Sequence, residues 1–218
     1  MKTVAVIPAY NEDETIASVI ENTRKYVDSV IVVDDGSRDE TYEHAAEADI
    51  LIRHSVNMNK GHAMITGIEA AIREGADIIV AIDADDQHDP EDIPLFIKTL
   101  IEENLDIVFG SRKLDGNMPP VLRFGNLFLT TATYALYGIW ISDTQSGFRV
   151  FTKEAYKKIK WKSKDYRMET EMIVNAAKNK LKYKELKIKT RYNNPHKGTT
   201  VMDGIKIFTS LIIWRITK

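Results

Sequence analysis

Residues 77–88 read DIIVAIDADDQH, an apolar run that ends in three carboxylates, an amide and an imidazole. A run of Ile and Val without alternating polar residues is typical of a strand that is buried on both faces. Similar runs occur elsewhere, and segments of helical periodicity separate them. They are TVAVIP (3–8), SVIVVD (29–34), ADILIRH (48–54) and LDIVFG (105–110). The pattern predicts an α/β fold, with a mainly parallel sheet that is covered by helices on both faces.

The helices of the first half are expected at about 14–26, after Asp39, after Lys60 and from Pro90. The second half reads differently. Residues 124–142 carry no charge but include an asparagine, three threonines and a glycine, which favours a helix under a groove or at a bilayer surface over a spanning helix. Residues 183–191 alternate like an edge strand. Residues 202–218 predict a C-terminal helix, either packed on the sheet or lying at a membrane interface.

Polar segments follow four of the predicted strands. They are PAYNE (8–12), DDGS (34–37), DADDQH (83–88) and GSR (110–112). In open α/β sheets, ligands bind beyond the carboxyl ends of the strands. The shared position of these segments therefore predicts one binding site at that edge of the sheet.

Asp83 and Asp85 stand two residues apart where a strand becomes a loop, so both side chains can face the same side. Gln87 continues this spacing and adds a carbonyl oxygen. Ligands that are all oxygen favour Mg²⁺ or Mn²⁺, which would share oxygens with a diphosphate. The alternative is a solvated acidic turn that starts the next helix.

The other strand ends allow two interpretations each. Asp35 is placed to accept hydrogen bonds from a ribose, or it belongs to a simple turn. The ring of Tyr10 is placed to cover a base and Glu12 to bond its edge, while packing of Tyr10 on its own helix is the alternative.

Composition excludes several classes of protein. The chain has 218 residues, 44% apolar and 28% charged, and no cysteine. Disulfides and thiolate metal sites are therefore excluded, and a reducing, cytoplasmic location is expected. No G-x-G-x-x-G follows the first strand and no G-x-x-x-x-G-K-[ST] occurs, which disfavours dinucleotide oxidoreductases and P-loop nucleotidases. A strand that starts at Lys2 predicts no signal peptide.

Charge is distributed unevenly along the chain. Residues 1–149 hold 12 Lys and Arg against 26 Asp and Glu, whereas residues 150–218 hold 18 against 6. The acidic part suggests a metal or cationic ligand, and the basic part suggests an anionic partner or solvated lysines. No nucleic-acid partner is predicted. We expect one domain over 1–218, with a first half (1–112) and a second half (113–218) that ends in an amphipathic helix.

The ordered set of PAYNE, VVDDGS, NKGHAMITGI, DADDQHDPEDIP, GSR and DTQSGFRV resembles the family 2 glycosyltransferases. Within this family the chain looks like the dolichyl-phosphate mannose synthase branch and its polyprenyl-phosphate relatives. The resemblance covers residues 1–151. It implies the GT-A fold, a nucleotide-sugar donor (GDP-mannose or a UDP-sugar), a divalent metal (Mg²⁺ or Mn²⁺) and a dolichyl or polyprenyl phosphate acceptor. It also implies peripheral contact with the cytoplasmic face of a membrane.

The resemblance also implies roles for individual residues. The nucleoside pocket would comprise Pro8, Tyr10, Glu12, Val33 and Asp35, and the metal and diphosphate site Asp83, Ala84, Asp85 and Gln87, with Asp83, Asp85 and Gln87 on the metal. Arg112 would reach the donor phosphates and Arg123 the lipid phosphate, so that Asp85, Arg112 and Arg123 form the catalytic set; a surface ion pair is the alternative for each arginine. The acceptor-side loop would supply Asp143, Ser146, Gly147 and Arg149.

The sequence departs from this family near its end. Mannose synthases often carry R-x-x-G-x-S-K after the last strand, whereas this chain reads RYNNPHKGTTVM at 191–202. His196 and Lys197 are the candidate substitutes as phosphate ligands. A phosphate acceptor needs no protein base, because a monoester with a second pKa near about 6 is largely dianionic at neutral pH.

Three alternatives stay open at this stage. A glycosyltransferase that acts on a sugar hydroxyl would need a base, for which Asp143 is the candidate. A nucleotidyltransferase would need a glycine-rich loop that PAYNEDET lacks. A non-catalytic sugar-nucleotide-binding subunit is the third. The sequence does not select the base or the sugar.

Overall fold

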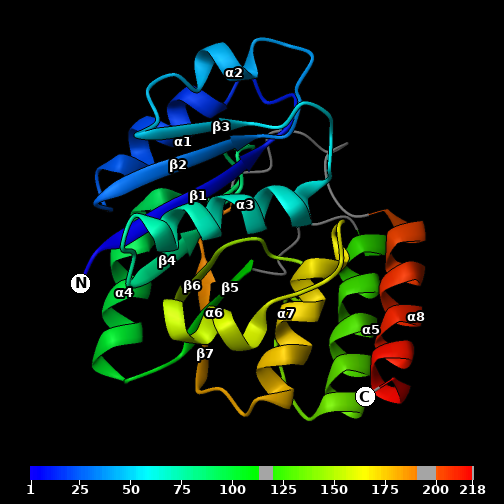
Figure 1. Cartoon of the computed structure of the whole chain (residues 1–218). Coiled ribbons are helices and arrows are strands. Elements are labelled where there is room, and N and C mark those ends of the chain that lie inside the picture. The colour runs from blue at the N-terminus through cyan, green and yellow to red at the C-terminus, as the bar shows by residue number, and fades with distance from the viewer. Residues whose placement is uncertain (113–119, 191–199, 218) are drawn as a thin grey trace.

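The computed structural model describes residues 1–112, 120–190 and 200–217 and confirms the predicted α/β fold (Figure 1). Its sheet has seven strands in the order β3-β2-β1-β4-β6-β5-β7. The strands are β1 (Thr3–Ala9), β2 (Ser29–Asp34), β3 (Ile50–Arg53), β4 (Ile78–Ala81), β5 (Ile107–Arg112), β6 (Arg149–Thr152) and β7 (Tyr183–Ile188). The helices are α1 (Ile16–Arg24), α2 (Thr41–His44), α3 (Lys60–Arg73), the 3-10 turn η1 (Pro90–Asp92), α4 (Ile93–Glu102), α5 (Pro120–Tyr137), α6 (Lys153–Ile159), α7 (Arg167–Lys178) and α8 (Val201–Ile216).

Strand β6 is the one antiparallel member of the described sheet. It runs against both of its neighbours, β4 and β5, while the remaining pairs are parallel. Its first residue, Arg149, lies beside Ala81 at the end of β4 and beside Phe109 of β5. The start of β6 therefore shares an edge of the sheet with the carboxyl ends of the parallel strands.

The alternation of side chains along the strands builds two hydrophobic cores. Val4 and Val6 of β1 face a core that α3, α6 and α7 complete, whereas Ala5 and Ile7 face one completed by α1 and α4. Because both faces are covered, the strands carry apolar residues at successive positions. This accounts for the continuous Val and Ile runs in the sequence.

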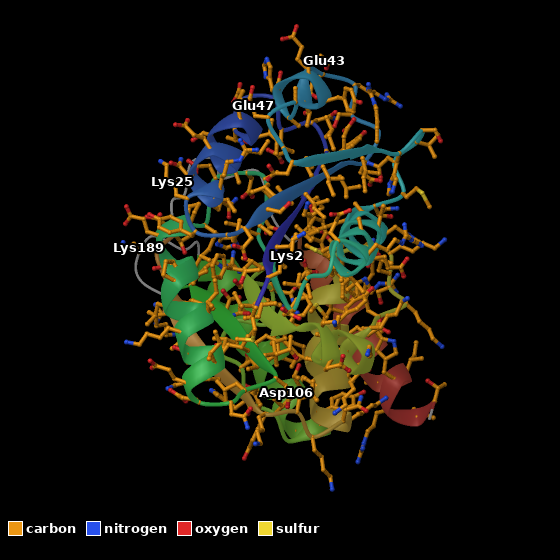
Figure 2. All side chains as sticks on the ribbon, turned by 60° about the vertical axis from the view of Figure 1, so that its left-hand side comes forward. Lys2, Lys25, Glu43, Glu47, Asp106 and Lys189 are labelled. Carbon is orange, nitrogen blue, oxygen red and sulfur yellow. The ribbon has the colours of Figure 1, made fainter. Side chains whose placement is uncertain are left out.

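Most predicted elements occur with small differences in their ends. The helix expected at 14–26 spans Ile16–Arg24, and the helix expected after Asp39 is the single turn α2. The predicted edge strand is β7, which pairs with β5 alone among the described strands. Figure 2 shows that Glu43 and Glu47, from the region of α2, lie at the opposite end of the molecule from Asp106, which precedes β5.

Of the two alternatives for the C-terminal helix, packing on the sheet is wrong. Helix α8 lies beside α5 and contacts α5 and α7, as Figure 1 shows. It begins with a capping box between Thr200 and Asp203. Ile207 and Leu211 are buried against the neighbouring helices, and the rings of Phe128 and Phe208 lie 4.9 Å apart. A helix can bury one stripe against other helices as well as against a sheet, and the sequence pattern does not distinguish these partners.

The uncharged stretch forms most of α5 and the loop that follows it. Its buried polar side chains bond within the protein: Asn126 donates to the Ser142 carbonyl (2.8 Å) and Thr130 to the Ile141 carbonyl (3.0 Å). Among the described residues, no helix has both the length and the apolar character that crossing a bilayer requires.

Candidate active site

A cavity of about 480 Å³ opens at the carboxyl ends of the parallel strands. Ten of the residues singled out from the sequence line it: Pro8, Tyr10, Glu12, Asp35, Asp83, Ala84, Asp85, Gln87, Arg112 and Gly147. The fold thus brings together segments that are up to about 140 residues apart in the chain, because the parallel strands all end at one edge.

The two loops after β1 and β2 are joined by hydrogen bonds. The Asn11 amide donates to the Ser37 hydroxyl (2.9 Å), and the Arg38 amide donates to the Asn11 side chain (2.9 Å). The Glu12 amide donates to the Thr41 hydroxyl at 2.7 Å. These bonds fix the loop that carries Tyr10, whose ring is 38% exposed and lines the cavity.

Asp35 is held through one of its two carboxylate oxygens. Oδ1 lies 2.6 Å from His54 Nδ1 and accepts a hydrogen bond from the Met58 amide at 2.9 Å. Oδ2 is buried and has no hydrogen-bond partner within the described part of the chain. Asp35 lines the cavity, and Oδ2 is the acceptor of its carboxylate that no described group satisfies.

Lys60 forms a partly buried ion triad with Asp83 and Glu169 on the cavity wall. Its ammonium lies 2.7 Å from Asp83 Oδ1 and 2.9 Å from Glu169 Oε1. Burial alone would lower the pKa of Lys60, but the charges of the two carboxylates raise it on balance. Burial would likewise raise the pKa of Asp83, yet the Lys60 charge and a hydrogen bond to His88 hold it below its usual value. Both groups are therefore charged at neutral pH.

Gly147 is required next to Asp83. A Cβ atom at this position would lie 2.3 Å from Asp83 Oδ2 and 2.6 Å from Oδ1, closer than atoms can approach. A side chain at position 147 would therefore displace the Asp83 carboxylate where the loop before β6 packs on the end of β4.

Asp85 lies on the cavity wall after Asp83. Its Oδ1 accepts a hydrogen bond from the Gln87 amide (3.1 Å) across a turn in which Asp86 has a positive φ of 55°. Burial raises the pKa of Asp85, and the charge of Asp83 raises it further. A cation beside Asp85 would offset this unfavourable charge.

The donor set at this edge fits a hard divalent cation. No group of three or more His, Asp and Glu side chains in the described ranges is arranged to hold a metal ion by itself. Asp85, Gln87 and the second oxygen of Asp83 supply oxygen donors only, and Mg²⁺ typically takes one or two carboxylates and completes its shell with water and substrate phosphate. The residues thus fit an ion that is bound together with a diphosphate.

Arg112 and Asp143 form a bidentate pair. Arg112 Nε donates to Asp143 Oδ2 (2.7 Å) and Nη2 donates to Oδ1 (3.0 Å). Asp143 is 1% exposed; burial would raise its pKa, but the Arg112 charge lowers it on balance. Arg112 lines the cavity, whereas Asp143 lies behind it. In the structure this carboxylate orients Arg112, and its predicted acceptor contact stays a prediction.

Three other predicted site residues are buried away from the cavity lining: Val33, Ser146 and Arg149. Val33 is fully buried, packs next to Gly67 of α3 and is not among the residues that line the cavity, so its place in the nucleoside pocket stays a prediction. Ser146 is 2% exposed and outside the lining, although the adjacent Gly147 belongs to it.

Arg149 is buried beneath the site instead of facing an acceptor. It donates to the carbonyls of Glu169 (2.7 Å), Ser146 (3.3 Å) and Thr144 (3.4 Å), and its guanidinium lies 5.3 Å from the centre of the Phe109 ring. Burial lowers its pKa to about 10, so it stays charged at neutral pH. Its guanidinium ties together the loop before β6 and the first turn of α7.

The remaining two predicted residues are not in the described cavity lining. Arg123 is exposed on α5. Lys197 lies outside the described residues, as does His196.

The cavity contains polar residues that the sequence reasoning did not select. They are Asn57, Asn59, Lys60, His88, Gln145, Asp165 and Tyr166. Lys60 and the asparagines lie in or next to a recognised motif, NKGHAMITGI, from which no residue was chosen. Asp165 and Tyr166 lie in a lysine-rich segment whose pattern indicates a solvated loop, so no local signal pointed to them.

The geometry agrees with comparisons to known proteins. The family model described as "Glycosyl transferase family 2" matches residues 4–160. The chain belongs to glycosyltransferase family 2. A UDP-N-acetylglucosamine–dolichyl-phosphate N-acetylglucosaminyltransferase of Methanococcus voltae is 39% identical to it, over 98% of this chain and 96% of that protein. The polyprenol monophosphomannose synthase of Mycolicibacterium smegmatis is 27% identical, over 94% of this chain and 83% of that protein.

Solved structures in the same comparison share the fold of this glycosyltransferase. Glucosyl-3-phosphoglycerate synthase from Mycobacterium tuberculosis, in complex with phosphoglyceric acid, superposes with a TM-score of 0.78 at 21% identity. The match covers 97% of this chain and 79% of the synthase. The predicted GT-A fold is therefore confirmed.

The Gly147→Ala variant tests the packing of the loop against Asp83. The new methyl group would displace the Asp83 carboxylate, so we expect nucleotide binding to weaken and stability to fall by about 1–3 kcal/mol. Gly125→Ala is the matched control, because a Cβ there meets nothing within 4 Å. Calorimetric titration with UDP and Mn²⁺ measures nucleotide binding, and urea unfolding measures stability. Equal behaviour of the two variants would contradict the assignment.

The Asp143→Asn variant tests the buried ion pair through its pH dependence. Loss of the Asp143 charge from this pair should cost about 1–3 kcal/mol at pH 7, measured by urea unfolding. The folded-state pKa of Asp143 lies below its unfolded value of about 3.9, so its stabilisation is complete above about pH 4 and is lost as the pH falls through the folded pKa. The gap between wild type and variant should therefore narrow below about pH 4. A gap that stays constant down to pH 3 would refute this account.

Proposed function

We propose that this glycosyltransferase moves a hexose from a nucleotide sugar to a polyprenyl monophosphate with inversion at the anomeric carbon. The observation that carries the proposal is the Asp85 carboxylate, which lines the cavity together with Arg112 and carries a raised pKa. A carboxylate whose negative charge is disfavoured by burial is stabilised by a bound cation, and that cation can bind the diphosphate of the donor. The donor is proposed to be a UDP-sugar, in particular UDP-N-acetylglucosamine, because the Methanococcus voltae relative named for that donor is 39% identical across nearly the whole chain.

Asp85 would hold a Mg²⁺ or Mn²⁺ ion with help from Gln87 and Asp83. The bound ion would supply positive charge against the donor diphosphate as the sugar–phosphate bond breaks. Arg112 is oriented by Asp143 to place a second positive charge on the same diphosphate, and this orientation is set before the substrate binds. Tyr10, Glu12 and Asp35 would bind the nucleoside.

A phosphate acceptor accounts for the lack of a suitable base at Asp143. The rival, a hydroxyl acceptor, requires a group that takes up a proton. Asp143 is buried, is paired with Arg112, and has a lowered pKa, so it is a poor base. A monoester dianion attacks without giving up a proton. The reaction then depends on holding the two phosphates in place, for which Arg123 is the proposed acceptor-side ligand.

The exposed apolar surface of α5 and α8 supports peripheral contact with the cytoplasmic face of a membrane. Phe124 and Leu127 of α5 are 74% and 53% exposed, and Ile205 and Ile216 of α8 are 53% and 76% exposed. Helices of this kind, with basic residues such as Arg215 among the apolar ones, bind at bilayer interfaces. The proposed partner is an anionic bilayer that carries the lipid acceptor.

The Asp85→Ala variant tests the chemistry. We expect transfer from radiolabelled UDP-N-acetylglucosamine to a short polyprenyl phosphate to fall by about a hundredfold or more, with an unchanged melting temperature. Glu43→Gln, at an exposed position on α2, is the control and should retain full activity.

Label in the organic phase supports a lipid phosphate acceptor, while label that stays in water supports the hydroxyl rival. GDP-mannose and UDP-glucose tested in parallel identify the donor. A fully active Asp85→Ala variant would remove the metal assignment.

The Arg123→Ala variant tests the acceptor side. We expect the KM for polyprenyl phosphate to rise by about tenfold while the KM for the donor stays nearly constant, because one charge-assisted contact is lost. Arg73→Ala removes an exposed arginine at the end of α3 and serves as the control. An unchanged acceptor KM for Arg123→Ala would exclude the proposed contact.

A further inference from the structure

His54 follows β3 directly and bridges the Asp35 carboxylate and helix α3. Its Nδ1 lies 2.6 Å from Asp35 Oδ1, and its Nε2 lies 3.1 Å from the Thr66 hydroxyl. The His54 side chain is 11% exposed and the Asp35 side chain 3%. Asp35 lines the cavity, whereas His54 does not. The histidine is therefore placed behind the carboxylate and not against a ligand.

The hydrogen-bonding capacities of the groups fix how this arrangement works. An ionised carboxylate only accepts, so His54 Nδ1 carries the proton and donates to Asp35 Oδ1. The Thr66 hydroxyl, which can donate or accept, bonds Nε2. The Met58 amide is the second donor to Oδ1. Asp35 is thereby fixed through one oxygen by a side chain and a backbone group.

The other oxygen, Oδ2, is buried without a hydrogen-bond partner in the part of the chain that the structure describes. A buried acceptor without a donor costs free energy, and such a group in a cavity wall is satisfied when a ligand brings the donor. A nucleoside offers two kinds of donor, the imide N–H of its base and the hydroxyl groups of its ribose.

We propose that His54 is a positioning residue that holds Asp35 so that Oδ2 accepts a hydrogen bond from the nucleoside of the donor. This inference rests on the proposed function. Without His54, the carboxylate would keep the Met58 amide but would lose the side chain that fixes its rotation. Nucleotide affinity should then depend on the donor group at Nδ1 and not merely on the size of residue 54.

Two amide variants test whether nucleotide affinity depends on a donor at the position of Nδ1 or on the size of residue 54. The amide nitrogen of Asn is bonded to Cγ, as Nδ1 of His is, so His54→Asn retains a donor close to Asp35. The amide nitrogen of Gln is one bond further out, so His54→Gln has its donor toward Thr66 instead. We expect His54→Gln to weaken UDP binding with Mn²⁺ by about tenfold or more, as expected for loss of a hydrogen bond to a charged group, and His54→Asn to stay within about threefold of wild type.

The readouts are calorimetric titration with UDP and Mn²⁺, the split between donor KM and kcat, and the melting temperature of each variant. We expect the donor KM of His54→Gln to rise, with kcat at saturating donor changed by less than about threefold. His44→Gln, an exposed histidine on α2, is the control and should match wild type. Equal losses for His54→Asn and His54→Gln, or a loss confined to melting temperature, would overturn the proposal.

Altered nucleotides identify the group that Oδ2 accepts from. We compare UDP with 2′-deoxy-UDP, 3′-deoxy-UDP and 3-methyl-UDP, which lack one ribose hydroxyl, the other ribose hydroxyl and the base imide hydrogen, respectively. The nucleotide that lacks the relevant donor should bind wild type and His54→Gln with nearly equal affinity. If the His54→Gln change weakens the binding of all four nucleotides equally, the carboxylate accepts from none of these donors and the proposal fails. If wild type and Asp35→Asn both fail to bind UDP, the proposed function itself fails, which is a separate result.

Discussion

The ion triad of Lys60, Asp83 and Glu169 is the interaction on which the rest of the site depends. It joins the start of α3, the end of β4 and the first turn of α7, three segments that the strand order alone does not fasten together. A parallel sheet collects its strand ends at one edge, and this chain places carboxylates there. Without a buried cation they would repel each other and take up protons. The ammonium of Lys60 keeps Asp83 ionised, and Asp85 stays available to a ligand of opposite charge.

The sheet was readable from the sequence because its strands are covered on both faces. Such strands must be apolar at successive positions, and the Val and Ile runs show this directly. The partner of α8 was not readable. Its apolar residues recur at helical spacing whether they meet a sheet or other helices, and α5 and α7 are the partners in the structure. The antiparallel direction of β6 was not predicted either, since a four-residue strand gives no sign of its direction.

The site was only partly predictable from the same information. Residues that directly follow a buried strand, such as Asp35, Asp83 and Asp85, were found because strand ends share an edge. A motif does not reveal which of its side chains turn inward, and nothing in the sequence indicated that Arg149, in a recognised segment, is buried beneath the cavity. Tyr166 was missed because it belongs to no recognised motif. It reaches the cavity because the loop before α7 packs on Gly61, where a Cβ would lie 2.4 Å from the Ser163 carbonyl.

The reversed direction of β6 has a consequence for how such a chain diversifies. The chain leaves the sheet at Arg112 and re-enters it at Arg149, and both points lie at the edge that holds the cavity. The segment between them starts and finishes at the same place, and the Arg112–Asp143 pair fastens it there. Residues can therefore be inserted between these two points without changing strand order or register, provided that the contacts of Asp143 and Gly147 with the sheet are kept. Evolution can thus remodel one wall of the cavity while strands β1 to β4 are inherited intact.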